Sequence, residues 1–229
     1  MWTSAEKLDN DRLIVAVWGP PKTGKTTFAL TAPGPIYFHN FDWGLEHHLG
    51  KLADKKVYVA SYLSVGPELT ADEAKDMLKA FERDYAAALK AGEGTIVIDT
   101  ATQLWQITSK VFLEDIKAKR RDGNIYPFDY ANANAYFQNL INQVKNTKMN
   151  MVLIQRAKAK YNASGNDTGE MDMQGNNQVG YLAQVVLALR KEEGQHRGII
   201  TDCWNSTALE GVDLANPTFD GLKALIDSV

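Results

Sequence analysis

Residues 19–26 have the types and spacing needed to bind phosphate. They read Gly-Pro-Pro-Lys-Thr-Gly-Lys-Thr, which is the G-x-x-x-x-G-K-T pattern of a P-loop. Glycines let consecutive backbone N–H groups face one anion, the lysine reaches the β- and γ-phosphates, and the threonine hydroxyl ligates Mg²⁺. A simple Gly/Pro turn is the alternative, but it would have to match several fixed residue types by chance. The predicted nucleotide-binding residues are Gly19, Pro20, Pro21, Lys22, Thr23, Gly24, Lys25, Thr26 and Thr27.

Two aspartates follow short apolar runs, as is typical of the carboxyl ends of buried parallel strands. Asp42 comes directly after residues 36–41, and Asp99 ends the continuous run over residues 95–99. Ligands bind at that edge of an open α/β sheet, so both carboxylates could reach a bound nucleotide. Asp99 is predicted to hold Mg²⁺ together with Thr26. The alternatives are a strand cap for Asp99 and an ordinary turn residue for Asp42.

Two further segments concentrate positive charge between predicted elements. Residues 117–127 contain four cations within five residues, followed by Asp-Gly and Pro, and are predicted to form a mobile basic loop. Residues 156–179 begin Arg-Ala-Lys-Ala-Lys-Tyr and continue in small polar residues, which predicts a long loop that is either functional or disordered. This second segment follows a buried strand over residues 151–155, whose last residue is the polar Gln155.

Composition and element order favour one large α/β domain. The chain has 229 residues, of which 45% are hydrophobic and 23% charged, so it can bury a sizeable core. We predict a single domain over residues 1–229, with residues 1–12 as an N-terminal tail and a mostly parallel central sheet flanked by helices. The predicted strands span residues 13–18, 36–41, 56–60, 95–99, 151–155, 182–191 and 197–204, and the predicted helices span 27–30, 44–51, 70–89, 101–116, 130–144 and 218–226. Thr70 and Glu73 form a capping-box pattern at the start of the helix over residues 70–89.

Other features of the composition exclude several classes of protein. Cys203 is the only cysteine, which excludes an internal disulfide and a zinc site built from cysteines. The chain has neither an apolar run near the ~20 residues that span a membrane nor a signal-peptide pattern. We therefore predict an intracellular protein without a membrane partner. A net charge of −3 argues against a uniformly basic surface but allows local basic loops.

The order of these parts resembles the RecA/RadA recombinase core, and most closely the small phage-encoded RecA-like ATPases associated with single-strand annealing. The resemblance covers about residues 13–204 and implies a RecA-like P-loop NTPase core that hydrolyses ATP with Mg²⁺. It implies that Asp42 activates the attacking water and that Asp99 ends the Walker B strand. Gln155 is similar to the polar sensor that links the γ-phosphate to a DNA-binding loop. The predicted catalytic residues are Lys25, Asp42, Asp99 and Gln155.

The resemblance also implies binding partners. The two basic segments match the two DNA-binding loops of the family, which implies single-stranded DNA as the partner and recombination or strand annealing as the process. Cations would hold the phosphates, and Tyr161 would either stack on a base or anchor its loop. A homo-oligomer with ATP at the protomer interface is implied, as is a partner that anneals or binds single-stranded DNA. A phage-encoded protein of this kind would act in the cytoplasm of a bacterial host. The predicted DNA-binding residues are Lys117, Lys119, Arg120, Arg121, Arg156, Lys158, Lys160 and Tyr161.

Two other classes of protein share a P-loop. A small-molecule or nucleotide kinase could use the basic residues 117–121 as a phosphate-clamping lid, but it needs a second, acceptor pocket that the sequence does not reveal. A nucleotide-switched adaptor or GTPase is the other alternative. Residues 146–150, Asn-Thr-Lys-Met-Asn, lack the spacing and the final Asp of the guanine-reading N-K-x-D pattern. The sequence therefore favours ATP over GTP.

Overall fold

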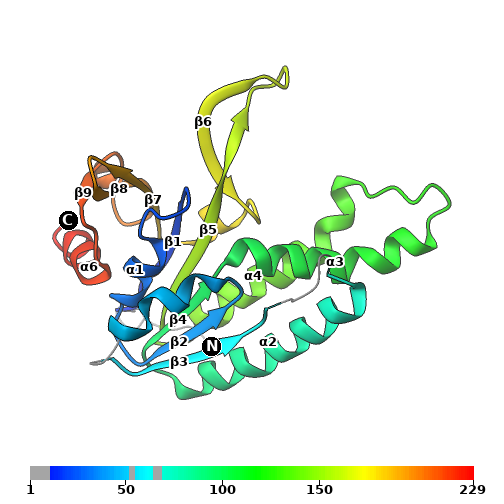
Figure 1. Cartoon of the computed structure of the whole chain (residues 1–229), viewed down its shortest axis with the longest axis horizontal. Coiled ribbons are helices and arrows are strands. Elements are labelled where there is room, and N and C mark those ends of the chain that lie inside the picture. Colours follow the sequence, from blue (N-terminus) through cyan, green and yellow to red (C-terminus); the bar gives the residue numbers. More distant parts are fainter. Residues whose placement is uncertain (1–10, 52–54, 64–68) are drawn as a thin grey trace, which may run out of the picture.

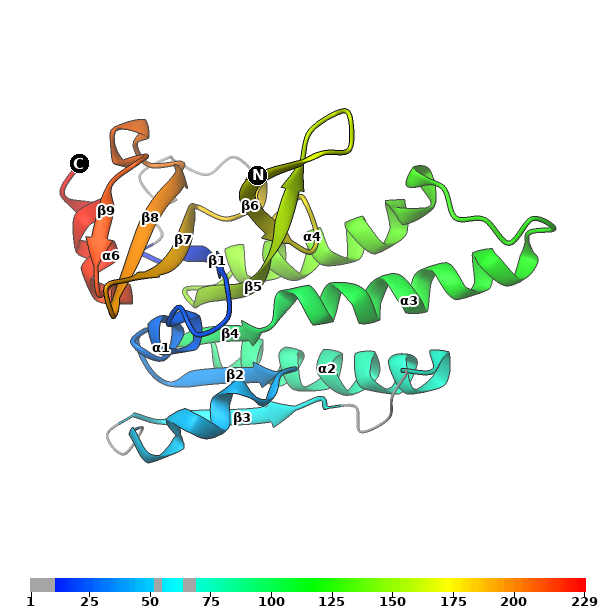
Figure 2. The same ribbon diagram turned by 45° about the horizontal axis from the view of Figure 1, so that its top comes forward.

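A computed structural model describes residues 11–51, 55–63 and 69–229, so most of the predicted N-terminal tail lies outside the described residues. The centre of the protein is a nine-stranded sheet in the order β3-β2-β4-β5-β1-β7-β8-β9, with β6 paired to β5 (Figures 1 and 2). The strands are β1 (Ile14–Gly19), β2 (Ile36–Asn40), β3 (Val57–Ser61), β4 (Thr95–Asp99), β5 (Asn150–Tyr161), β6 (Asp167–Gln174), β7 (Val185–Glu192), β8 (Gln195–Cys203) and β9 (Asp213–Ala215).

The six strands from β3 to β7 in the sheet order all run parallel to their neighbours, whereas β6, β8 and β9 are antiparallel. This confirms the predicted α/β class with a mostly parallel sheet. Strand β5 lies between β1 and β4, and its register places Arg156 opposite Gly19 and Ile154 opposite Asp99. The carboxyl ends of β1, β2 and β4 therefore meet at one edge of the sheet, where β5 continues beyond them.

Helices cover both faces of this sheet. The core on one face combines residues of α2, α3 and α4, and the core on the other combines residues of α1 and α6. Apolar side chains of alternating strand residues, such as Leu153 and Ile154 on β5, enter opposite cores. The helices are α1 (Lys25–Leu30), α2 (Ala71–Ala91), α3 (Ala101–Lys119), α4 (Ala131–Lys145), α5 (Val179–Leu182) and α6 (Phe219–Asp227), with 3₁₀ turns η2 (Trp43–Lys51), η3 (Pro127–Tyr130) and η4 (Thr207–Leu209).

The limits of α2 follow from its terminal residues. The Thr70 hydroxyl accepts a hydrogen bond from the Glu73 N–H, and the Glu73 carboxylate accepts one from the Thr70 N–H. These two bonds satisfy backbone donors that a helix start leaves unpaired. At the other end Gly92 adopts a left-handed conformation, with φ of 75°, that stops the helix. The capping box predicted from the sequence is therefore confirmed.

Two predicted loops differ from the structure. The long loop predicted over residues 156–179 is wrong, because residues up to Tyr161 continue β5 and residues 167–174 form β6 antiparallel to it. The resulting β5–β6 hairpin extends from the body of the protein (Figure 1). The basic loop predicted to begin at Lys117 begins later, since α3 extends to Lys119. The segment after it lies at the far ends of α3 and α4, away from the sheet (Figure 2).

Candidate nucleotide site

The P-loop connects β1 to α1 in a conformation that depends on glycine. Gly19 has φ of 153° and Gly24 has φ of 92°, values that residues with a side chain rarely adopt. A Cβ atom on Gly19 would also lie 2.2 Å from the backbone oxygen of Leu189, on the neighbouring strand β7. Gly19 is therefore required both by its backbone angle and by its close contact with β7.

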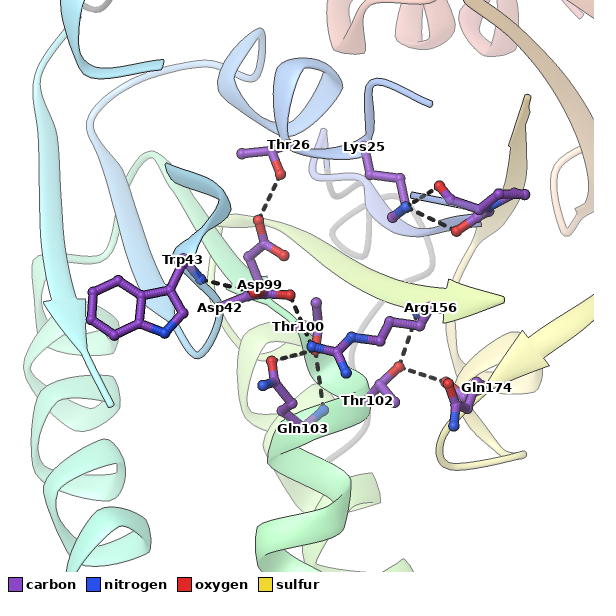
Figure 3. A network of polar contacts seen from close by, with 12 residues as sticks. Lys25, Thr26, Asp42, Trp43, Asp99, Thr100, Thr102, Gln103, Arg156 and Gln174 are labelled. Carbon is purple, nitrogen blue, oxygen red and sulfur yellow. Dashed lines mark hydrogen bonds and ion pairs between the residues drawn. The ribbon is translucent and has the colours of Figure 1, made fainter. Parts of the chain in front are cut away.

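Lys25 is the first residue of α1, and its ammonium group lies inside the P-loop. Its Nζ donates to the backbone oxygens of Gly19, at 2.8 Å, and Pro20, at 2.6 Å (Figure 3). Burial lowers the pKa of Lys25, and the nearby charge of Asp99 opposes this shift. A partly desolvated cation enclosed by the loop is well placed to exchange these carbonyl groups for phosphate oxygens.

Thr26 and Asp99 form the pair expected to ligate Mg²⁺. The Thr26 hydroxyl donates to Asp99 Oδ2 at 2.8 Å, and the Asp99 side chain comes from the end of β4 (Figure 3). Burial raises the pKa of Asp99 to about 6, and the hydrogen bond from Thr26 opposes this shift. One hydroxyl and one carboxylate suit Mg²⁺, which prefers oxygen ligands and is completed by waters and substrate phosphates. Among the described residues, no group of three or more His, Cys, Asp or Glu side chains could hold a metal ion. A metal ion at this site would therefore need waters and substrate phosphates as further ligands.

Asp42 follows β2 at the same edge of the sheet and is held on both carboxylate oxygens. Its Oδ1 accepts from the Trp43 N–H at 2.8 Å, and its Oδ2 accepts from Arg156 Nη2 at 2.9 Å. Arg156 was predicted to contact DNA, but its side chain lines a cleft of about 290 Å³ together with Lys25 and Asp99. Asp42 lines that cleft too. The predicted metal-binding and water-activating residues therefore come together, with an arginine that the sequence did not place among them.

Gln155 lies next to Arg156 on β5 but points to the opposite face of the sheet. Its side chain is fully buried, outside the cleft lining, and a Cβ on Gly175 would lie 2.5 Å from its Oε1. Considering the described residues alone, neither amide atom of Gln155 has a hydrogen-bond partner. The structure thus places Gln155 against the end of the β5–β6 hairpin, and its predicted contact with the γ-phosphate stays a prediction.

The remaining cations of the hairpin are paired with acids of β6. Lys160 Nζ lies 2.7 Å from Glu170, and Lys158 Nζ lies 4.0 Å from Asp172. Surface pairs of this kind are weak, but they balance the local positive charge. Tyr161, at the end of β5, is 63% exposed, which leaves its ring accessible to a ligand. Its two predicted roles, stacking on a base or anchoring its loop, stay predictions.

The basic segment between α3 and α4 is partly ordered by an ion pair. Both terminal nitrogens of Arg120 donate to the Asp129 carboxylate, at 2.6 and 2.8 Å, and its guanidinium lies over the rings of Tyr126 and Phe128. Asp129 is 8% exposed, so Arg120 neutralises a buried acid. Lys117, Lys119 and Arg121 are exposed and remain candidates for phosphate contacts. We refer to residues 117–130 as the basic tip.

The structure also shows two hollows that the sequence did not predict. An open groove of about 510 Å³ between the basic tip and the hairpin is lined in part by Trp105, Tyr126, Tyr130 and Lys158. A second pocket, of about 230 Å³ and mainly apolar, lies beside the P-loop. Its lining comes from segments far apart in the chain, so no local pattern could have revealed it. The pocket residues are Thr23, Gly24, Thr27, Phe28, Thr31, Leu189, His196, Asn216, Pro217 and Thr218.

The family of the protein follows from a comparison that covers most of this fold. A model of the AAA domain matches residues 11–208, which include the P-loop, both cleft aspartates and the whole hairpin. The chain belongs to the AAA domain family. Membership makes the protein a P-loop ATPase and implies that it binds a nucleotide, typically with Mg²⁺. None of the curated proteins matches the chain.

Across the described residues of this AAA domain, no helix has both the length and the apolar character needed to cross a membrane. For the protein as a whole, the absence of a membrane partner stays a prediction. Its predicted cytoplasmic location stays a prediction.

Proposed function

We propose that this AAA domain protein hydrolyses ATP with Mg²⁺ and couples hydrolysis to the binding of single-stranded DNA. The observation that supports the ATPase step most directly is the composition of the cleft. The cleft is lined by side chains from the ends of three parallel strands, β1, β2 and β4, or from the segments that follow these strands. These side chains are Lys25, Thr26, Asp42 and Asp99. Phosphoryl transfer depends on positioning and on charge neutralisation, and this set of groups supplies both.

Each residue has a separate role in this proposal. Lys25 and the P-loop amides bind the phosphates, while the Thr26 hydroxyl and the Asp99 carboxylate hold Mg²⁺. Bound Mg²⁺ would neutralise charge that develops on the phosphate oxygens. Asp42 orients the attacking water, and its partial exposure leaves room for that water.

We further propose that the apolar pocket beside the P-loop receives the adenine base. It adjoins the loop through Thr23 and Gly24, and its remaining lining offers the side chains of Phe28 and Pro217 as apolar walls. Asn216 adds an amide that can both donate and accept hydrogen bonds. A mainly apolar pocket with a few polar groups is what a nucleobase requires.

The proposal for single-stranded DNA rests on the RecA/RadA resemblance and on the arrangement of cations and aromatic rings. The basic tip presents three exposed cations, and the groove beside it exposes the ring of Tyr126. Aromatic rings bind single strands by stacking, and cations bind their phosphates. The hairpin, whose lysines are paired with acids, would contribute mainly through Tyr161.

Several finer proposals rest on the RecA/RadA resemblance alone. They are a homo-oligomer with ATP at the protomer interface, a partner that anneals or binds single-stranded DNA, and a role in phage recombination. A single RecA-like domain over residues 1–229 is also proposed, and the continuous sheet from β3 to β9 supports it.

The test is phosphate release from ATP, measured with and without single-stranded DNA. Wild-type protein should release phosphate with Mg²⁺ and release it faster with DNA, and Lys25→Ala should abolish release. Lys55→Ala is the matched control, because Lys55 Nζ also donates to two backbone oxygens, those of Leu30 and Ala32, outside the cleft. Normal turnover by folded Lys25→Ala protein would refute the ATPase assignment. Phosphate transfer to an added acceptor without release to water would favour a kinase instead.

A further inference from the structure

The ion pair between Asp42 and Arg156 crosses the nucleotide cleft. Asp42 lies in the segment that follows β2, and Arg156 lies on β5. The distance from Arg156 Nη2 to Asp42 Oδ2 is 2.9 Å (Figure 3). Both side chains are accessible, with exposed fractions of 37% for Asp42 and 41% for Arg156. An accessible ion pair is held weakly, so a competing anion could break it. We call this ion pair the latch.

In the latched arrangement Asp42 is poorly suited to its proposed role. One oxygen accepts from Trp43 and the other from Arg156, so both carboxylate oxygens are engaged. Each carboxylate oxygen can accept more than one hydrogen bond, but a water held by Asp42 must share an oxygen with one of these two donors. Loss of the Arg156 contact would leave Oδ2 free to accept from a water in the space that the partial exposure of Asp42 provides.

A bound triphosphate would supply the competing partner. Arg156 and Lys25 line the same cleft, and the charge of Arg156 acts on the Lys25 ammonium, as does that of Asp42. A terminal phosphate carries more negative charge than one carboxylate and presents several oxygens to a guanidinium, which binds phosphate in a bidentate manner. ADP, which lacks the third phosphate, would compete much less.

The backbone of Arg156 is tied to the rest of the site. Its N–H donates to the Thr102 hydroxyl at 3.0 Å, and that hydroxyl donates to the Gln174 backbone oxygen at 2.7 Å. Thr102 lies in the first turn of α3, three residues after Asp99. One hydroxyl thus connects the helix that follows the metal-binding aspartate to both strands of the hairpin. The backbone is fixed by these bonds, so the side chain of Arg156 is the part free to change partner.

From these contacts we propose that Arg156 is a γ-phosphate sensor that exchanges Asp42 for the terminal phosphate of ATP, and thereby frees Asp42 to orient water. This proposal rests on the function proposed above, since it requires that the cleft bind ATP. It assigns Arg156 to the nucleotide and not to DNA.

The test compares the affinities of ADP and of a non-hydrolysable ATP analogue, each with Mg²⁺, in four proteins. Arg156→Gln should weaken binding of the ATP analogue by about tenfold or more, the usual effect of losing a hydrogen bond between charged groups, and change ADP binding little. Asp42→Asn should tighten binding of the ATP analogue several-fold, because Arg156 no longer has a competing partner. In the double variant this gain should disappear.

The matched control is Arg190→Gln. Arg190 is also a partly exposed arginine, at 33%, and it pairs with Glu192 and Asp213 on the far strands of the sheet, outside the cleft. The Arg190→Gln variant should bind ADP and the ATP analogue with the affinities of the wild type. Charge loss or altered folding in general would affect Arg190→Gln and Arg156→Gln alike, whereas a sensor affects only the second.

Two results would overturn the sensor assignment. One is an equal loss of ADP and ATP-analogue affinity in Arg156→Gln, and the other is a gain in Asp42→Asn that persists in the double variant. A failure of the proposed function has a different signature, because neither nucleotide would then bind wild-type protein in a manner that depends on Lys25.

Discussion

His39 is a buried histidine on β2 whose protonation the fold opposes. Its side chain is 2% exposed, its ring meets the edge of Phe81 at 5.1 Å, and its Nδ1 lies 3.0 Å from the Tyr62 hydroxyl. Among the described residues its Nε2 has no hydrogen-bond partner. Burial lowers the pKa of His39 from 6.5 to about 4, and the Asp84 carboxylate opposes this shift only in part. Folding therefore favours the neutral imidazole.

This shift fixes the sign and the size of a pH effect on stability. The unfolded chain binds a proton below about pH 6.5, whereas the folded chain resists it until about pH 4, so the free energy of unfolding falls as pH drops through that window. The difference of about 2.5 pH units, at ~1.4 kcal/mol each, corresponds to a loss of about 3 kcal/mol by pH 4. Above pH 7.5 the effect is absent.

The substitution that tests this is His39→Gln, because glutamine stays neutral and its amide can donate to the Tyr62 hydroxyl, whose own proton goes to Asp84. Urea unfolding at pH 7.5 and pH 4.5 gives the free energy of unfolding of each protein. From pH 7.5 to pH 4.5, the free energy of unfolding of the wild type should fall by about 2 to 3 kcal/mol more than that of His39→Gln. His47→Gln, at an exposed histidine, should follow the wild type. A difference between wild type and His39→Gln that does not vary with pH would refute the reasoning.

Two further predictions concern the P-loop and the basic tip. Gly19→Ala places a Cβ against the backbone oxygen of Leu189 and should cost at least ~2 kcal/mol of unfolding free energy and abolish nucleotide binding. Gly92→Ala, where a Cβ meets nothing within 4 Å, should cost about 1 kcal/mol and bind nucleotide normally; equal losses would contradict this account. Neutralising the three exposed cations of the basic tip should weaken single-stranded DNA binding. A plot of the logarithm of the binding constant against the logarithm of the salt concentration should become less steep by about 2, and an unchanged slope would exclude these contacts. Arg120 is left intact in that variant because it pairs with Asp129. The three substituted cations are Lys117, Lys119 and Arg121.

The sequence predicted those parts of the fold that local patterns determine. The P-loop pattern predicted the positions of β1 and α1. Two apolar runs, each ending at or next to an aspartate, predicted β2 and β4 and placed Asp42 and Asp99 at the same edge of the sheet. The capping box at Thr70 located the start of α2. In each of these cases the residues that cause the structure lie within a few positions of it in the chain, so the pattern contains the cause.

The features that the sequence did not predict depend on contacts between distant residues. Strand β6 is mostly polar and exposed, with Met171 and Met173 as its only apolar side chains, too short an alternation to predict a strand, and it forms because its backbone pairs with β5. The latch joins residues 114 positions apart. The opposite directions of Gln155 and Arg156 follow from the alternation of side chains along a strand, which is predictable only once β5 is known to continue through both residues.

The continuity of β5 has a mechanical consequence. The same strand is a buried member of the sheet up to Gln155 and one arm of the hairpin from Arg156 onward, without a hinge residue between the two parts. At ~3.3 Å per residue, the turn of the hairpin lies about 20 Å from Arg156. A tilt of only ~10° at Arg156 would therefore displace that turn by about 3.5 Å. A small change in the cleft would in this way be amplified into a movement of several ångströms at the turn of the hairpin.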